Sequence, residues 1–268
     1  MAARDLAADG AVTEPVDVNV SLHGRTALIT GAGSGIGAAI AGRFVVAGAH
    51  VHAVDLSESA LQSLVDRHGS AITPWQLDLS DLTGHSRLPT DIDILVNNAG
   101  IQHVEPIESF PVETFDRILA IMLASPFRLI RAVLPHMYAR RWGRIVNISS
   151  VHGLRASEFK SAYVTAKHGL EGLSKVTALE GAEHGVTSNC INPAYVRTPL
   201  VEKQIDAQAA THHIAAYEVV TKVMLAPAAV KRLIEPVEVA ELALFLCGPA
   251  SASMTGGSYT MDGGWTAH

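Results

Sequence analysis

The sequence predicts an α/β fold, a single Rossmann-type domain with a doubly wound parallel sheet and helices on both faces. Two observations support this prediction. Short β-branched runs alternate with stretches of helical periodicity from Arg25 almost to the C-terminus, as in parallel sheets whose strands are joined by crossover helices. The strand-like runs are also apolar almost throughout, which is typical of strands covered on both faces.

Six strands are expected, and each is a short apolar run. They cover residues 25–30, 50–55, 74–78, 93–98, 143–149 and 186–192. After the first of them, Ile36, Ile40 and Phe44 recur at i, i+4 and i+8, which is the spacing of one helix face. Further helices are expected near residues 58–68, 111–139, 158–184 and 236–247.

The chain divides simply. Residues 1–22 are expected to form a flexible tail, and residues 23–268 one domain, because no linker or repeat interrupts them. Residues 199–226 break the alternation with helix-forming sequence that is followed by no strand. We expect this segment to form a helical lid.

Composition excludes several classes of protein. The net charge is −6 with 17% charged residues and no basic block, so no nucleic-acid partner is expected. No stretch has the roughly 18 to 20 uninterrupted apolar residues of a membrane span, and the acidic N-terminus is no signal peptide, so a cytoplasmic protein is expected. Cys190 and Cys247 lie in apolar surroundings and should be buried free thiols.

A glycine-rich turn follows the first strand and leads into a helix. It reads Thr30-Gly31-Ala32-Gly33-Ser34-Gly35-Ile36-Gly37. Such a turn lets backbone N–H groups at a helix N-terminus approach a pyrophosphate. Asp55 ends the second strand, where a carboxylate can accept the adenosine-ribose hydroxyls and would repel a 2′-phosphate. The pair predicts NAD rather than NADP, and the alternative is a structural turn beside an exposed acid.

Two further strand ends carry polar residues. Asp78 ends the third strand, and Asn97-Asn98-Ala99-Gly100 ends the fourth. Open α/β sheets bind ligands at the carboxyl ends of their strands, so these residues are expected beside a dinucleotide. For Asp78, a contact with the adenine and a simple turn cap remain equal alternatives.

Ser150, Tyr163 and Lys167 form the candidate catalytic group. Tyr163 and Lys167 are spaced at i and i+4, so they project from one helix face. Free tyrosine titrates near pH ~10, and serving as a base near neutrality requires roughly 4 kcal/mol of stabilisation of its phenolate. We expect the Lys167 ammonium and an oxidised nicotinamide to supply it together, while the Ser150 hydroxyl holds the reacting oxygen. Alone, the tyrosine–lysine pair would more often be a surface pair.

Taken together, these motifs resemble the short-chain dehydrogenase/reductase family. The resemblance covers about residues 22–268 and rests on TGAGSGIG, Asp55, NNAG, the Ser150 to Tyr163 spacing and YVTAK, in that order. It implies catalysis by Ser150, Tyr163 and Lys167 with a nicotinamide cofactor. It also implies cofactor contacts from Leu79, Val196 and Thr198, and a homotetramer packed through the helices near 111–139 and 158–184.

Further segments resemble the bacterial branch of the family that acts on D-3-hydroxybutyrate. They include GIQHVEPIESF, SVHGLRAS, TPLVEKQI and DGGWTAH. The resemblance implies NAD-linked oxidation of a small 3-hydroxy acid to the 3-oxo acid, with substrate contacts from Gln102, His152, Lys160, Gln204 and Trp265. The alternatives are a solvated charge for Lys160 and a packing histidine for His152. A 3-oxoacyl or sugar reductase and a non-catalytic NAD-binding regulator also remain open.

The chain departs from the family pattern at two positions. Met122 stands where many members have an asparagine that positions a water in the proton relay, and a thioether is a poor hydrogen-bonding group. Ala194 stands where the family has glycine, which could shift the loop beside the nicotinamide. No metal site is expected, because the pairs His50/His52 and His212/His213 have no further ligands near them in the sequence.

Overall fold

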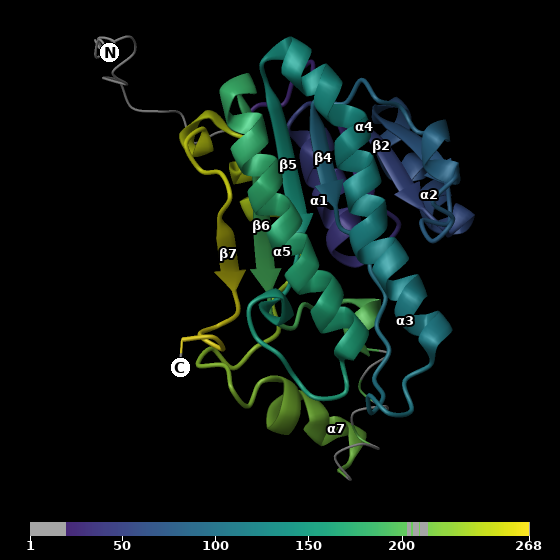
Figure 1. The fold of residues 1–268 in the computed structure, drawn as a ribbon, viewed down its shortest axis with the longest axis vertical. Coiled ribbons are helices and arrows are strands. Elements are labelled where there is room, and N and C mark those ends of the chain that lie inside the picture. The colour runs from purple at the N-terminus through teal and green to yellow at the C-terminus, as the bar shows by residue number, and fades with distance from the viewer. Residues whose placement is uncertain (1–19, 203–204, 206–208, 210–213, 268) are drawn as a thin grey trace.

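The computed structural model describes residues 20–202, 205, 209 and 214–267. One sheet of seven parallel strands, in the order β3-β2-β1-β4-β5-β6-β7, forms the centre of the domain (Figure 1). The strands are β1 (Thr26–Thr30), β2 (His50–Asp55), β3 (Ile72–Gln76), β4 (Ile94–Asn97), β5 (Gly143–Ile148), β6 (Val186–Pro193) and β7 (Ser258–Met261). The chain reverses its direction of winding between β1 and β4, which confirms the predicted doubly wound fold.

Helices cover both faces of this sheet. The α-helices are α1 (Gly35–Val46), α2 (Glu58–His68), α3 (Val112–Leu119), α4 (Ser125–Arg140), α5 (Ser161–Gly181), α7 (Ala216–Val219) and α8 (Pro236–Phe245). Two π-helical segments lie at Ala120–Ala124 and Val220–Met224. Short 3₁₀ turns lie at Gly69–Ala71, Gly84–Arg87, Val151–Gly153, Ala182–His184 and Pro249–Ser251.

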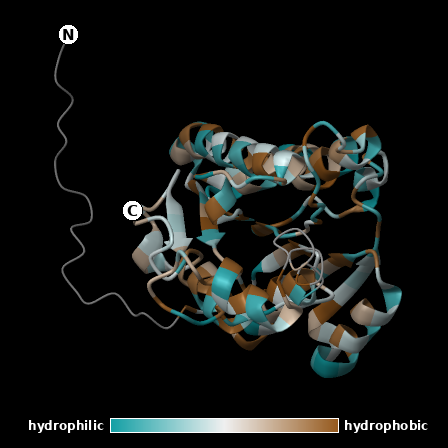
Figure 2. Ribbon diagram, turned by 90° about the horizontal axis from the view of Figure 1, so that it is seen from below, coloured by the Kyte–Doolittle hydropathy of each residue, from teal (hydrophilic) through white to brown (hydrophobic). Residues whose placement is uncertain are grey.

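Two apolar clusters, one on each face, form the core. The first joins the sheet to α1, α2 and α8 through residues such as Phe44 and Leu64. The second joins it to α4 and α5 through residues such as Leu129 and Ala166. Figure 2 looks at the molecule from below Figure 1 and shows helical layers on both sides of the strands. The free thiols Cys190 and Cys247 are both buried, as predicted.

The run Val112–Arg140 is long and apolar enough to cross a membrane by length and composition alone. It consists of α3, the first π-helical segment and α4. Within the domain, 44% of its most apolar window is buried, and Ile118, Leu129 and Val133 belong to the second core cluster. Its apolar residues therefore serve as those of a core helix.

The structure differs from the prediction at the start of the domain and at the last strand. Leu22 is 1% exposed and its N–H donates to Ala47 O at 2.7 Å, so residues 20–22 belong to the folded domain and not to the predicted tail. Residues 1–19 lie outside the described part of the chain. β7 is absent from the predicted strands because it is an edge strand whose four residues are only partly covered or exposed, without a continuous apolar run.

A charged cluster lies at the amino edge of the sheet. Asp93, whose side chain is 5% exposed, accepts ion pairs from Arg140 at 3.0 Å and from Arg25 and His136 at 3.6 Å. Its other oxygen accepts the Thr26 N–H at 3.1 Å, which ties β1 to β4. A buried carboxylate held this way is costly to unpair, so this edge has one preferred arrangement.

Candidate active site

A cavity of about 150 Å³ lies at the carboxyl edge of the sheet, where β1, β4, β5 and β6 end. It is lined by residues from the predicted cofactor, catalytic and substrate sets. Those that line it are Ser34, Gly35, Ile36, Asn98, Gly100, Gln102, Ser150, His152, Lys160, Tyr163, Lys167, Val196 and Thr198. The fold thus brings residues from across the sequence to one site.

The glycine turn lies directly against two neighbouring strand ends. Gly31 has φ +64°, and a Cβ there would lie 2.9 Å from the Ala99 Cα. A Cβ on Gly37 would collide with Gly31 O. The Ser34 side chain makes no cap bond to α1, so the first N–H groups of the helix remain directed at the cavity edge. This turn is a fitting cradle for the phosphates of a dinucleotide.

Asp55 stabilises the same turn. Its carboxylate accepts the Gly33 N–H and the Ser57 N–H, both at 2.9 Å. A Cβ on Gly33 would lie 2.9 Å from Asp55 Oδ2, so the backbone and the acid are in close contact. Asp55 therefore does stabilise a turn, as the structural alternative expects. Its carboxylate also lies next to the phosphate cradle.

Asn98 joins the end of β4 to the glycine turn. Its side-chain amide donates to Thr30 O at 2.9 Å and to Gly31 O at 3.1 Å. The Thr30 hydroxyl in turn accepts the N–H groups of Asn98 and Ala99. These bonds fix the cleft between β1 and β4, where the winding reverses.

Asp78 caps its own turn. Its carboxylate accepts the N–H and the hydroxyl of Ser80 at 2.9 and 2.7 Å, and these bonds lower the pKa of Asp78. A contact with adenine remains a prediction. Leu79 is 7% exposed and packs in the second core cluster, and its contact with a cofactor remains a prediction.

Tyr163 and Lys167 face the cavity from one side of α5, as predicted. Lys167 is 4% exposed, and its Nζ donates to Ile148 O at 2.6 Å, at the end of β5. The same Nζ lies 5.6 Å from the centre of the Tyr163 ring. Ser150 caps the short turn that follows β5, with its hydroxyl accepting the His152 N–H at 3.2 Å.

Burial dominates the electrostatics of this group in the protein alone. Burial raises the pKa of Tyr163 to about 12, although a hydrogen bond with Ser150 acts in the opposite direction. Burial also lowers the pKa of Lys167 to about 8. Burial thus disfavours the phenolate in the protein alone, because a phenolate is poorly solvated here. The lowering of the Tyr163 pKa by Lys167 together with an oxidised nicotinamide remains a prediction.

His152 is a neutral group within the cavity. Its Nδ1 lies 3.3 Å from Ser150 Oγ, and its Nε2 lies 2.9 Å from Ser157 Oγ. Burial, and next the charge of Lys160, lower the pKa of His152 to about 3. The ring lies 5.8 Å from that of Trp265, so it packs in the site as well as bonding there. His152 can offer a hydrogen bond but no positive charge near neutral pH.

Lys160 and Gln102 complete the predicted substrate set. Lys160 is 7% exposed, which rules out the alternative of a solvated helix-start charge, and its Nζ donates to the Tyr195 hydroxyl at 3.3 Å. Both side-chain amide atoms of Gln102 are buried without a hydrogen-bond partner among the described residues. A ligand or an ordered water in the cavity would supply the missing partners. Gln204 lies outside the described residues.

The two departures from the family pattern are accommodated locally. Met122 is 1% exposed in the π-helical segment, and its Cε lies 3.4 Å from where a Cβ on Gly100 would be. It therefore fills space behind Gly100. Ala194 is not among the described non-glycine residues with positive φ, and its N–H donates to Met261 O at 3.0 Å. Alanine is thus unstrained at this position.

Among the residues absent from the predicted set are three polar ones in or beside the site, Tyr195, Glu171 and Asn192. Tyr195 lines the cavity and contacts Lys160. Glu171 is 4% exposed and accepts the Asn192 amide at 2.5 Å and the Ser258 hydroxyl at 2.6 Å. The Asn192 amide also donates to Ser150 O at 2.9 Å. Glu171 follows Lys167 by one helical turn, and this spacing is the only sequence signal that could have indicated it.

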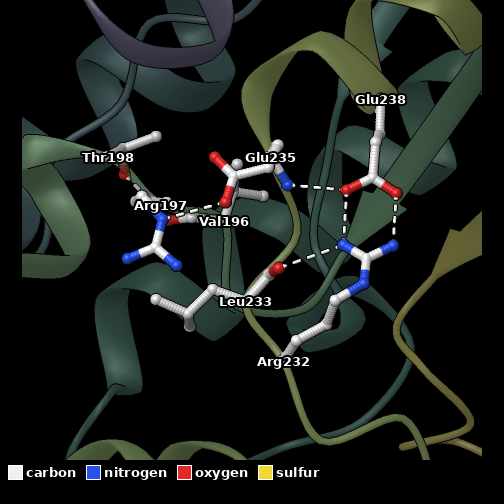
Figure 3. A network of polar contacts seen from close by, with 7 residues as sticks. All are labelled: Val196, Arg197, Thr198, Arg232, Leu233, Glu235 and Glu238. Atoms are coloured by element: carbon white, nitrogen blue, oxygen red, sulfur yellow. Dashed lines mark hydrogen bonds and ion pairs between the residues drawn. The ribbon is translucent and has the colours of Figure 1, made fainter.

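The loop after β6 is held by a polar network (Figure 3). Val196 pairs with Ile234, and Arg197 Nε donates to Glu235 at 2.9 Å. Nearby, both terminal nitrogens of Arg232 donate to Glu238 at 2.7 Å. This network positions Val196 and Thr198 at the cavity wall.

The described residues contain no group of three or more metal-ligating side chains. His50 Nε2 is hydrogen-bonded to the Thr73 hydroxyl, and His52 Nδ1 accepts the Trp75 indole N–H. His212 and His213 lie outside the described part of the chain.

Comparison with known proteins supplies the family. A family profile described as short chain dehydrogenase matches residues 25–209. The chain belongs to this family. It is accordingly an oxidoreductase with a Rossmann-like fold that takes a nicotinamide dinucleotide.

Curated relatives of this short-chain dehydrogenase match it over almost their whole length. The D-beta-hydroxybutyrate dehydrogenase of Rhizobium meliloti (strain 1021) is 48% identical over 91% of this chain and 99% of the relative. That of Cupriavidus necator is 41% identical over 92% of this chain and 99% of the relative. A solved structure from Beutenbergia cavernae is 32% identical, with a TM-score of 0.82 over 92% of this chain and 99% of that one. That protein is provisionally assigned as an NAD(P)-dependent gluconate 5-dehydrogenase and has NADP bound.

The burial of Tyr163 generates a prediction for the protein before dinucleotide is added. Because the protein raises the pKa of Tyr163 to about 12, this residue should stay protonated from neutral pH to about pH 10. Ultraviolet difference absorbance between the wild type and Tyr163→Phe should therefore show no phenolate in that range. A Tyr163 phenolate near neutral pH would contradict this prediction.

Proposed function

We propose that this short-chain dehydrogenase oxidises (R)-3-hydroxybutyrate to acetoacetate, reversibly and with NAD. The observation that carries the proposal is the placement of Lys160, His152 and Gln102 in the same cavity as Ser150 and Tyr163. A buried cation with amide and imidazole donors suits a small carboxylate. The two hydroxybutyrate dehydrogenases at 48% and 41% identity support the same substrate.

Tyr163 would act as the general base. Its phenolate takes the proton from the C3 hydroxyl of the acid, while Ser150 donates a hydrogen bond to the same oxygen. A nicotinamide dinucleotide held in this cavity would supply the hydride acceptor for the oxidation at C3. Lys167 would hold the nicotinamide ribose and favour the phenolate, which counters the burial that raises the Tyr163 pKa.

Lys160, His152, Gln102 and Gln204 would hold the carboxylate, with Trp265 as a wall. Lys160 would supply the positive charge, since His152 is neutral near pH 7 by its lowered pKa. Lys160 now donates to the hydroxyl of Tyr195, and a carboxylate would be a stronger acceptor than a hydroxyl. The proposed lid, residues 199–226, borders this space through Pro199, Leu200 and Val201.

The proposed preference for NAD rests on Asp55. Its carboxylate stands beside the glycine turn, where it would accept ribose hydroxyls and repel a 2′-phosphate. Gly31, Ser34, Gly35, Ile36 and Gly37 would cradle the pyrophosphate. Asp78, Leu79, Asn98, Ala99 and Gly100 would line the adenosine side, and Val196 and Thr198 the nicotinamide.

We also propose a cytoplasmic homotetramer. The outer faces of α4 and α5 expose large apolar side chains, among them Phe127 at 53%, Val176 at 52% and Leu179 at 79%. Beside them, Leu119, Leu123 and Leu173 line an open apolar hollow. Exposed apolar patches of this kind favour subunit contacts.

The proposed base has a direct test. Tyr163→Phe should lower the kcat for NAD-linked oxidation of (R)-3-hydroxybutyrate by roughly 10²- to 10⁴-fold, because the proton acceptor is lost. A steady-state assay that follows NADH absorbance measures it. The matched control is Tyr259→Phe on β7, which lies outside the catalytic cavity and the proposed lid and should keep wild-type turnover. Unchanged turnover in Tyr163→Phe, or no oxidation by the wild type, would reject the proposed function.

Lys160→Ala tests the carboxylate site. The KM for (R)-3-hydroxybutyrate should rise by about 10- to 100-fold, since a hydrogen bond to a charged group contributes about 1.5–3 kcal/mol. Turnover of a neutral secondary alcohol should not change. Lys175→Ala, which removes an exposed lysine on the same helix, is the control. Equal losses for the acid and the neutral alcohol would favour a reductase of neutral substrates instead.

Asp55→Ser tests the cofactor preference. Removing the carboxylate should raise the ratio of kcat/KM for NADP to that for NAD by roughly tenfold or more, because the repulsion of the 2′-phosphate is lost. Glu58→Gln, which neutralises an exposed acid nearby on α2, should leave the ratio unchanged. A wild type that already prefers NADP would show the proposed role of Asp55 to be wrong. The Tm of each variant shows whether losing the hydrogen bond between Asp55 and Gly33 destabilises the protein.

A further inference from the structure

A second cavity lies beside the catalytic one. It has a volume of about 410 Å³, and the two cavities share Ala194 and Tyr195 as lining residues. Much of the rest of its wall is apolar, with contributions from Met224, Leu225, Ala228, Val230, Ile234 and Met261. The proposed mechanism uses none of these six residues.

Tyr195 is held in place from three directions. Its hydroxyl accepts a hydrogen bond from Lys160 Nζ at 3.3 Å. Its ring packs against the apolar cluster formed by Val201, Val219 and Met224. Its carbonyl accepts the Ile234 N–H at 3.0 Å. A side chain fixed at its backbone, ring and hydroxyl is a rigid partition between the two cavities.

Another part of the wall of the second cavity is also held by side-chain bonds. Arg232 lines this wall together with Glu238, and the two form a bidentate ion pair at 2.7 Å (Figure 3). Because this pairing already neutralises the guanidinium, the cavity offers little to an anionic ligand. Its apolar walls suit an alkyl chain.

We propose that Tyr195 determines substrate chain length, by closing the catalytic cavity against a preformed apolar cavity that would otherwise receive the alkyl chain of longer 3-hydroxy acids. This inference rests on the proposed function and adds the residue that restricts it to short acids. Tyr195 contacts Lys160, which would hold the carboxylate, and borders the cavity that contains Tyr163, which would act at C3. It therefore flanks the substrate along its length.

The test compares (R)-3-hydroxyhexanoate with (R)-3-hydroxybutyrate as substrates of the full-length protein with NAD. In Tyr195→Ala the ratio of kcat/KM for the hexanoate to that for the butyrate should rise roughly tenfold or more, since each methylene accommodated in an apolar pocket favours binding about tenfold or more. Tyr195→Phe keeps the ring and removes only the bond to Lys160. It should raise KM for both acids and leave their ratio unchanged.

A double variant separates an opened cavity from a loosened site. Adding Ala228→Leu to Tyr195→Ala fills part of the second cavity, because Ala228 is 4% exposed and lines it. The ratio should then return toward the wild-type value. If Tyr195→Ala does not fold, as judged by thermal unfolding, Tyr195→Val provides the same opening with more apolar packing.

The outcomes distinguish the two proposals. If the wild type oxidises the butyrate but folded Tyr195→Ala or Tyr195→Val keeps the wild-type ratio, the role of Tyr195 is refuted and the proposed function stands. An equal rise in Tyr195→Phe would also refute it, since the ring would then not be the barrier. If the wild type oxidises neither acid, both proposals fail.

Discussion

The buried ammonium of Lys167 is the group on which the rest of the site depends. Removing such a charge from water costs several kcal/mol unless other groups compensate. Here Ile148 O accepts a hydrogen bond at 2.6 Å, and the Glu171 carboxylate follows one helical turn later. Glu171 also accepts bonds from Asn192 and Ser258, on β6 and β7. Hydrogen bonds of Lys167 and Glu171 therefore connect α5 with three strands, and Asn192 also donates to the carbonyl of Ser150.

Around this cation, burial keeps Tyr163 and His152 neutral near pH 7. It raises the pKa of Tyr163 to about 12 and lowers the pKa of His152 to about 3. In a poorly solvated cavity, a charge that enters interacts more strongly with each of these groups than it would in water. The site is thus prepared to respond to the charges of its ligands, and the ionisation of Tyr163 is set by what is bound and not by the helical turn alone.

Much of the fold could be predicted because buried parallel strands are apolar throughout, and this signal identified six strands. It fails for β7, an edge strand with a mixed pattern. Motif residues such as Tyr163 and Lys167 could be found because their spacing is local. Tyr195 could not, because its importance comes from Lys160 and from a second cavity, both distant in sequence. The pKa of Tyr163 in the protein alone could not be predicted, because a sequence shows the neighbouring charge but not the burial that opposes it.

The two edges of the sheet are built differently. At the amino edge, Asp93 gathers Arg25, His136 and Arg140, and Trp142 lies between the guanidinium groups of Arg25 and Arg144, at 3.7 and 4.6 Å. None of these groups takes part in the proposed chemistry. Because ligands meet only the opposite edge, loops there can be exchanged while this anchorage stays intact. Substrate specificity can therefore change, in evolution or in the laboratory, without loss of the interactions that stabilise the fold.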